Sequence, residues 1–159
     1  MLFTMFAGKM MAVCLRYARS QEEAEDMLQE GFIRVFSNLQ QFKFEGSFEG
    51  WIRRVMVNNA LKALEKKKIN FLEVSGKHEY SQSLEPAAYT GLGEEELLKM
   101  INALPDGYRV VFNLNVIEGY SHEEIGKMLN IQPSTSRSQL VKARKMLQKQ
   151  VLQLQKIAV

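Results

Sequence analysis

The segment that most constrains the fold of this chain is residues 120–147, which is typical of two short helices joined by a tight turn. Ser121 and Glu124 have the spacing of a capping box, in which each side chain accepts a hydrogen bond from a backbone N–H at a helix start. Asn130 suits a left-handed residue at the end of that helix. Pro133 suits the first turn of the next helix, where its missing N–H costs nothing. The segment therefore predicts a helix-turn-helix, whose second helix enters the major groove of DNA.

At about 100° per residue, the second helix of this motif separates an apolar stripe from a basic side. The apolar stripe consists of Ser136, Leu140, Ala143 and Leu147. The candidate DNA contacts lie opposite or on one flank, and they are Ser134, Arg137, Ser138, Val141, Lys142 and Lys145, with Arg144 beside Arg137. The alternative is an ordinary solvated surface helix. Residues 133–156 contain six Lys or Arg and no acid, whereas a face exposed only to water usually mixes signs, so we favour DNA.

Charge is informative through its distribution rather than its total. The net charge of +3 is a weak argument for nucleic acid, but acidic and basic residues are separated along the chain. Residues 21–30 contain five acids and no base, while basic residues concentrate at 53–68 and 137–156. The sequence therefore predicts separate acidic and basic surfaces.

Composition also excludes several classes. A single Cys14 rules out an intramolecular disulfide, and with only two histidines we expect no metal site, no cofactor and no enzymatic constellation of His, Cys or paired carboxylates. No apolar stretch approaches the roughly 18 residues that span a bilayer. We expect no signal peptide, no membrane insertion and a cytoplasmic location.

Helical periodicity dominates both ends of the chain and fades between them. We expect helices over residues 3–19, 20–39, 48–68, 94–104 and 108–117, with Ser20 and Ser47 as N-caps and Asp106 as a further cap. The sequence thus predicts an all-α fold with two small domains, 1–69 and 94–159, joined by a flexible linker at 70–93.

The N-terminal half offers three candidate surfaces. In the second expected helix, an apolar stripe that runs to Phe36 and Leu39 lies opposite an acidic face that includes Asp26, Gln29, Glu30 and Ile33. A solvated face is the default interpretation, but an exposed isoleucine among acids suits docking to a basic protein. The loop containing Phe42, Lys43 and Phe44 favours aromatics that fold back onto the core, with a base-stacking pocket as the alternative. On the third helix, Arg54, Asn58 and Lys62 are placed to follow a phosphate backbone, with Leu61 expected on the same side.

A family resemblance joins these features. Four motifs, in this order, resemble the extracytoplasmic-function (ECF) sigma factors of the bacterial sigma-70 family: Asp26-Met-Leu-Gln-Glu-Gly-Phe-Ile-Arg-Val-Phe, Phe48-Glu-Gly-Trp-Ile-Arg-Arg-Val-Met-Val-Asn-Asn-Ala, Leu104-Pro-Asp-Gly-Tyr-Arg-Val-Val-Phe and Ser134-Thr-Ser-Arg-Ser-Gln-Leu-Val-Lys-Ala-Arg. The resemblance covers nearly the whole chain. It departs from the family at Met1, which falls inside the family's first helix and indicates a shortened or divergent start. It also departs at the serine-rich start of the recognition helix, so the promoter sequence of relatives does not transfer.

The resemblance implies roles for the candidate residues. Asp26, Gln29, Glu30 and Ile33 would dock on the clamp coiled coil of core RNA polymerase. The segment with Phe42, Lys43 and Phe44 would capture a base flipped from the promoter −10 element, and Arg54, Asn58 and Lys62 would contact that element. The helix from Pro133 would read the −35 element, and an anti-sigma factor is a further potential partner.

Two other interpretations remain open at this point. A stand-alone helix-turn-helix regulator would need a dimer face or an effector domain, and neither is evident in the sequence. It would also leave the basic helix and the aromatic loop of the N-terminal half unexplained. A purely structural helical adaptor would use the acidic face but gain nothing from a basic recognition helix.

Overall fold

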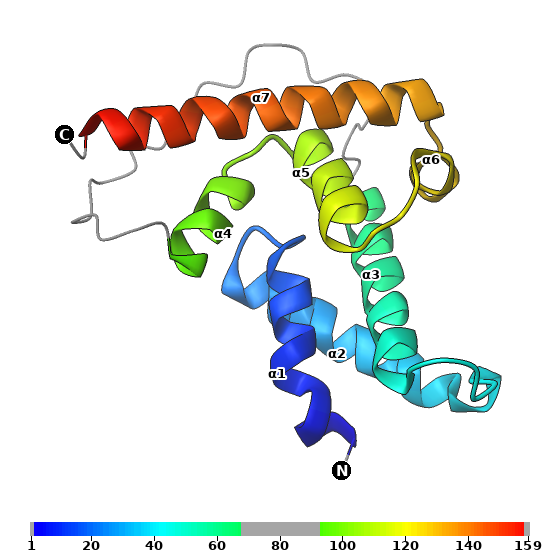
Figure 1. Cartoon of the computed structure of the whole chain (residues 1–159). Helices are drawn as coiled ribbons and strands as arrows, with labels where there is room; N and C mark the ends of the chain where they lie inside the picture. Colours follow the sequence, from blue (N-terminus) through cyan, green and yellow to red (C-terminus); the bar gives the residue numbers. More distant parts are fainter. Residues whose placement is uncertain (1, 68–92, 158–159) are drawn as a thin grey trace. The chain divides into compact units, whose positions relative to one another are not determined.

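The computed structural model describes residues 2–67 and 93–157, and every regular element within them is a helix (Figure 1). The predicted all-α class is therefore confirmed. The chain divides into two compact units, which are called here the N-terminal unit (residues 1–69) and the C-terminal unit (residues 70–159). Apart from Gly93, the expected linker at 70–93 lies outside the described residues.

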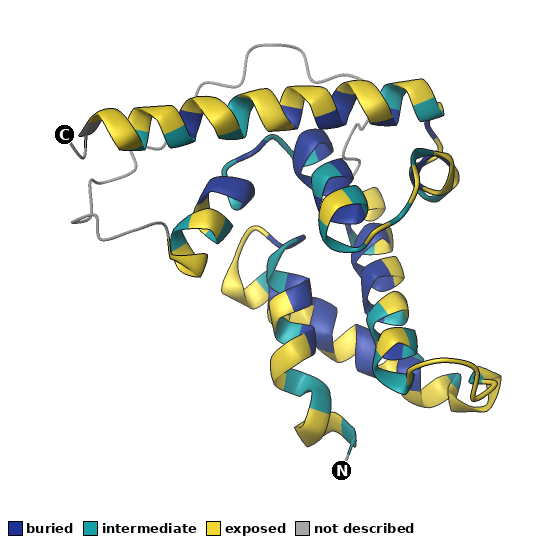
Figure 2. Ribbon diagram, in the orientation of Figure 1, coloured by how far each residue is buried: buried dark blue, intermediate teal, exposed yellow. Residues whose placement is uncertain are grey.

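Three helices that all pack on one another form the N-terminal unit: α1 (Leu2–Leu15), α2 (Gln21–Ser37) and α3 (Phe48–Lys66). A 3₁₀ turn at Leu39–Gln41 follows α2. The buried residues lie on the sides where these helices meet (Figure 2). Cys14 is among them, and burial raises the pKa of its thiol to about 11, so it stays protonated near neutral pH.

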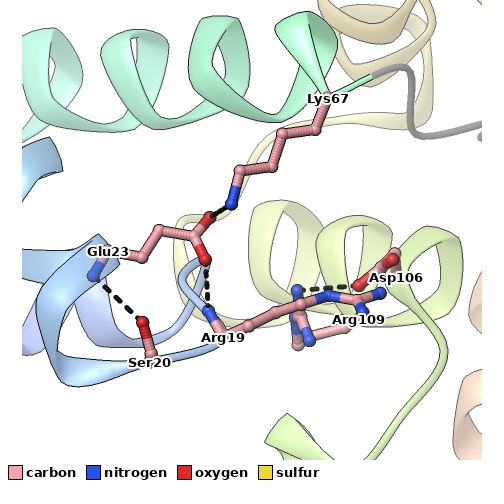
Figure 3. Close-up of polar contacts among 6 residues, drawn as sticks. All are labelled: Arg19, Ser20, Glu23, Lys67, Asp106 and Arg109. Carbon is pink, nitrogen blue, oxygen red and sulfur yellow. Dashed lines mark hydrogen bonds and ion pairs between the residues drawn. The ribbon is translucent and has the colours of Figure 1, made fainter.

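Side-chain caps fix where α2 and α3 begin. The Ser20 hydroxyl accepts a hydrogen bond from the Glu23 amide at 3.1 Å, and the Ser47 hydroxyl accepts one from the Gly50 amide at 3.2 Å. Both predicted N-caps are confirmed, and such a cap typically contributes about 1 kcal/mol. The Glu23 carboxylate also accepts from the Arg19 amide at 3.1 Å and pairs with Lys67 at 2.8 Å, which connects the start of α2 to the end of α3 (Figure 3).

Close contact between α2 and α3 sets which face of α3 is exposed. The Asn59 side-chain amide donates to the Met27 carbonyl at 3.0 Å, and a Cβ built on Gly31 would lie 2.2 Å from the Met56 sulfur. This packing buries Leu61, which is only 8% exposed. The prediction that Leu61 shares the basic side was therefore wrong, because the buried side of α3 is broader than its periodicity indicated.

The C-terminal unit contains α4 (Glu94–Asn102), α5 (Asp106–Phe112), a π-helical turn (Asn113–Ile117), α6 (His122–Leu129) and the long α7 (Pro133–Ile157). Helix α7 packs against α4, α5 and α6. Its Ala143 joins Leu104 and Tyr108 in the core of this unit, with Phe112 packed alongside.

Two local expectations in the C-terminal unit need correction. Asp106 does not cap α5 but is its first residue, with Pro105 at the N-cap. The Asp106 carboxylate instead pairs at 3.0 Å with Arg109, which is 3% exposed and therefore needs a charged partner (Figure 3). The helix expected at 108–117 is also interrupted, because it passes into the π-helical turn at Asn113.

The turn between α6 and α7 has the predicted geometry. Ser121 and Glu124 form both hydrogen bonds of the capping box, at 3.1 and 3.2 Å, and Asn130 is left-handed with φ +55°. A Cβ built on Gly126 would lie 2.7 Å from the Ile131 carbonyl oxygen. The backbone of the turn therefore approaches α6 more closely than any side chain there would allow.

Candidate nucleic-acid and protein-binding surfaces

The outer face of α7 is polar and basic along its first turns. Of the predicted apolar stripe, Ser136, Leu140 and Ala143 are buried, and Leu147 is partly buried against the core. The six candidate DNA contacts are all exposed: Ser134, Arg137, Ser138, Val141, Lys142 and Lys145. The two-sided division of this helix is therefore confirmed, whereas its contacts with DNA stay a prediction.

Two polar contacts connect α6 to the first turns of α7. His122 Nδ1 lies 2.8 Å from the Ser136 hydroxyl, which is fully buried. Glu123 lies 3.8 Å from Arg137, and both side chains are more than half exposed. An exposed pair of this kind contributes at most about 1 kcal/mol, so a phosphate group can compete with Glu123 for the Arg137 guanidinium.

On α3, the three predicted contact residues share one exposed face. Arg54, Asn58 and Lys62 follow one another at four-residue spacing and are all exposed. Residues spaced by four are neighbours on a helix surface. The side chains of Ile52, Met56 and Asn59 are buried on the other side. The face can therefore offer two cations and one amide to a nucleic acid.

The loop before α3 lines an open, aromatic pocket of about 540 Å³. Its lining residues are Leu39, Phe42, Phe44, Gly46 and Phe48. The Phe42 ring packs 5.1 Å from Phe48 and 5.7 Å from Trp51. Phe42 thus folds back onto the helices, as the favoured interpretation expected.

Phe44 behaves differently from Phe42. Its side chain is 88% exposed, although its ring centroid lies only 5.0 Å from that of Phe42. Its φ of +56° is uncommon for a residue other than glycine and is costly for a bulky one. The loop therefore holds an aromatic ring outward at the edge of the pocket, where a planar ligand could stack on it.

Sequence reasoning missed two residues of this pocket region, Phe48 and Trp51. They were assigned only to the helix, but their rings stack at 5.9 Å with an interplanar angle of 15°. The signal was available, because aromatic residues three apart at a helix start share one face beside the preceding loop. The pocket is therefore built from the first residue of the 3₁₀ turn, the loop and the first turn of α3.

The acidic face of α2 is exposed as predicted. Asp26, Gln29 and Glu30 are all accessible, and Ile33 is 64% exposed among them. Phe36 lies one turn further along and is 48% exposed, although it was expected in the apolar stripe that faces the core. Leu39 is exposed as well, because it lies in the 3₁₀ turn and lines the aromatic pocket. The outer surface of α2 therefore combines negative charge with two large apolar side chains.

Within residues 2–67 and 93–157, no helix combines the length and apolarity needed to cross a membrane. The same part of the chain contains no group of three His, Cys, Asp or Glu side chains arranged to hold a metal ion. The candidate surfaces are exposed faces of α2, α3 and α7 and one aromatic pocket.

Comparison with known proteins places both units in one family. Residues 2–69 match sigma-70 region 2, and residues 94–147 match sigma-70 region 4. The chain is 30% identical to the ECF RNA polymerase sigma factor SigW of Bacillus subtilis, over 94% of this chain and 86% of the relative. It is 31% identical to the ECF RNA polymerase sigma factor SigE of Mycolicibacterium smegmatis, over 89% of this chain and 56% of the relative.

A solved structure supports the fold. The sigma factor RpoE of Bartonella quintana, in complex with the anti-sigma factor NepR, superposes with a TM-score of 0.59 at 20% identity and covers 99% of this chain and 96% of that chain. Likeness at this identity bears on fold alone, and it agrees with the two matched regions. The two region matches, together with the relatives in Bacillus and Mycolicibacterium, show that the chain belongs to the ECF RNA polymerase sigma factors of the sigma-70 family.

Proposed function

We propose that this sigma factor divides its work between its two units. The N-terminal unit binds core RNA polymerase through α2 and the promoter −10 element through α3 and the aromatic pocket. The C-terminal unit reads the −35 element through α7. The observation that carries this assignment is that fifteen of the sixteen candidate side chains are exposed, all but the half-buried Phe42. Their charge fits their partners, since the acidic face lies on α2 and the basic faces lie on α3 and α7.

For the −10 element, the pocket beside Phe44 supplies a stacking surface for one unpaired base. Stacking on an aromatic side chain is worth about 1–3 kcal/mol per base, whereas DNA stacking costs about 1.4 kcal/mol per step to disrupt. One captured base thus offsets about one step of opening. Arg54 and Lys62 would neutralise phosphates of the opened strand, and Asn58 can hydrogen-bond a base edge.

For the −35 element, the first turns of α7 occupy the major groove. Ser134 and Ser138 can donate to or accept from base edges, and Val141 suits a thymine methyl group. Arg137, Lys142 and Lys145 add phosphate or guanine contacts. The bond between His122 and Ser136 holds this face in place relative to α6.

The remaining partners follow from the same surfaces. Ile33 and Phe36 would insert among the basic residues of a polymerase docking site, while Asp26 and Glu30 provide the complementary charge. An anti-sigma factor, which accompanies the sigma factor in the Bartonella structure, would block these surfaces. In this scheme polymerase carries out the chemistry, the chain has no catalytic activity of its own, and both act in the cytoplasm.

Run-off transcription with purified core polymerase and a promoter library tests the proposal. We expect transcripts that depend on this chain and share two sequence elements at a fixed spacing. Sequence-specific binding to duplex DNA without polymerase, combined with no transcript, would instead indicate a stand-alone regulator. If the promoters of these transcripts shared only a −35-like element, the role proposed for the aromatic pocket would be refuted.

A further inference from the structure

Helix α7 continues past the end of the region 4 match. The region 4 match ends at residue 147, whereas α7 runs without interruption to Ile157 (Figure 1). At 1.5 Å per residue, the extension from 148 to 157 adds about 15 Å of helix. The extension therefore offers surface that the matched region does not account for.

This extension prolongs the recognition face. Lys149 and Lys156 are both exposed. At 100° per residue they fall in line with the earlier exposed residues, so that one stripe about 80° wide runs along the whole helix. The stripe consists of Ser134, Ser138, Lys142, Lys145, Lys149, Leu152 and Lys156. Gln150, 8% exposed, lies on the packed side of the extension.

The chemistry of the stripe changes along the helix. Its first two residues are serines, which suit base edges, and every later residue except Leu152 is a lysine. A lysine ammonium is a point charge on a flexible stem, which suits phosphates better than bases. No acidic residue interrupts α7 between Pro133 and Ile157. The recognition helix therefore changes from hydroxyl groups that suit base edges to ammonium groups that suit phosphates.

The C-terminal part of α7 that carries Lys149 and Lys156 extends beyond the width of the DNA major groove. Lys142 and Lys156 are separated by about 21 Å along the helix axis, whereas the major groove is about 12 Å wide. When the first turns lie in the groove and the helix axis crosses it, the extension passes over the phosphates that border it. Continuity with the recognition face, and lysines without any acid on α7, both favour DNA as the occupant.

We propose that the extension of α7 is a sequence-independent binding site for the sugar-phosphate backbone flanking the −35 element, with Lys149 and Lys156 as its contacts. The inference rests on the proposed −35 role of α7. The main alternative is a protein partner, for which Leu152 would be the anchor, because it is 58% exposed between the two lysines.

The test compares a K149Q/K156Q double variant of the full chain with a K99Q control, which removes one exposed cation from α4. Fluorescence anisotropy measures binding to two duplexes that carry a −35 element selected with the wild-type chain. One duplex is trimmed to the element, and the other is extended by about ten base pairs on each side. The slope of log K against log salt falls by about 0.9 per lost phosphate contact. For K149Q/K156Q on the extended duplex, we expect the magnitude of this slope to fall by nearly 2. On the trimmed duplex the slope should not change, and the preference for the −35 element over a scrambled element should be the same as in the wild type.

Three results would overturn the inference in distinguishable ways. Equal salt slopes for K149Q/K156Q and wild type on the extended duplex would show that Lys149 and Lys156 do not contact phosphates. The proposed −35 role of α7 would be unaffected by that result. Reduced transcription by the variant holoenzyme with unchanged DNA binding would assign the stripe to a protein. Absence of any sequence preference in the wild-type chain would remove the −35 role, and the flanking site with it.

Discussion

The two units build their candidate DNA-binding surfaces in different ways. In the C-terminal unit the surface is one face of one helix, and local bonds at Ser121, Asn130 and Ser136 fix its position. In the N-terminal unit the surface combines a loop, a 3₁₀ turn and α3, and it depends on contacts between α2 and α3 such as that of Asn59 with Met27. The first kind of surface follows from periodicity and capping, whereas the pocket within the second follows only from tertiary packing.

If the two units unfold independently, a core defect in one should leave the other folded. Leu64 is fully buried in the N-terminal unit, and Leu64→Ala should destabilise that unit by about 2–5 kcal/mol. Trp51 is the chain's single tryptophan, so its fluorescence reports this unit alone. In urea, the Trp51 transition should shift to lower concentration while part of the helical circular dichroism is retained.

Ile125→Ala, at a fully buried position of the C-terminal unit, is the matched control for this experiment. It should shift the circular dichroism transition and leave the Trp51 transition where it is. Simultaneous loss of both signals in either variant would show that the two units unfold as one.

The tight turn of the helix-turn-helix provides the second test. A Cβ at position 126 would meet the Ile131 carbonyl oxygen, a backbone atom that cannot rotate away. Gly126→Ala should therefore cost about 1–3 kcal/mol and weaken −35 binding. Gly8→Ala is the control, since nothing lies within 4 Å of its Cβ; replacing a helical glycine there should be neutral or stabilising. Unchanged stability in Gly126→Ala would mean that the turn is looser than the structure indicates.

Base capture can be tested at Phe44. Phe44→Ala should destabilise the open promoter complex by about 1–3 kcal/mol, the value of one stacked base. Phe44→Trp should retain most of the activity, because it keeps a ring at the same position. Permanganate footprinting of the −10 region measures the opened fraction. Equal opening by wild type and Phe44→Ala would refute stacking at this residue, and the −35 affinity serves as the internal control.

Sequence reasoning predicted the C-terminal surface well because the cues there are local. The capping box, the left-handed Asn130 and the two-sided pattern of α7 were each readable from short spacings and were found in the structure. The π-helical turn at Asn113 and the pair between Asp106 and Arg109 were not, because neither follows from helical periodicity.

The N-terminal unit contains features that could not be predicted from local sequence patterns. Its helices and both serine caps were predicted, but the pocket was not assembled, because Leu39 joins Phe42 only after α2 and α3 have packed. The opposite behaviour of Phe42 and Phe44 depends on a left-handed backbone at position 44. Leu61 was misplaced for the same reason, since burial on α3 is decided by two neighbouring helices rather than one.

Because the two units are assigned different partners, two sets of variants should each lose a different affinity, either for the −35 element or for core polymerase. Arg137→Ala or Lys142→Ala should weaken −35 binding about tenfold each, which corresponds to about 1.4 kcal/mol, and leave polymerase binding unchanged. Asp26→Ala combined with Ile33→Ala should weaken polymerase binding and spare −35 binding. Anisotropy with labelled duplex and with labelled core polymerase measures the two affinities. A variant that loses both equally would contradict the assignment of its surface.

The smallest expected effect concerns Glu123, whose carboxylate lies 3.8 Å from Arg137. Since both groups are exposed, Glu123→Gln should change the free energy of unfolding by less than about 1 kcal/mol. The −35 affinity should nevertheless rise a few-fold, because Arg137 is released to the DNA and a negative charge near the phosphates is removed. The gain should shrink as salt increases, since screening weakens the repulsion.

Two controls isolate this contact between α6 and α7. Glu95→Gln removes an equal charge from the exposed surface of α4, so it separates a general charge effect from a local one. Glu123→Gln made in an Arg137→Ala background should give little further gain, because the arginine it restrains is absent. A gain of the same size in that background would show that Glu123 acts by repelling DNA directly. The recognition face would then be one surface shared by α6 and α7, and the single-helix description of the C-terminal surface would have to be widened.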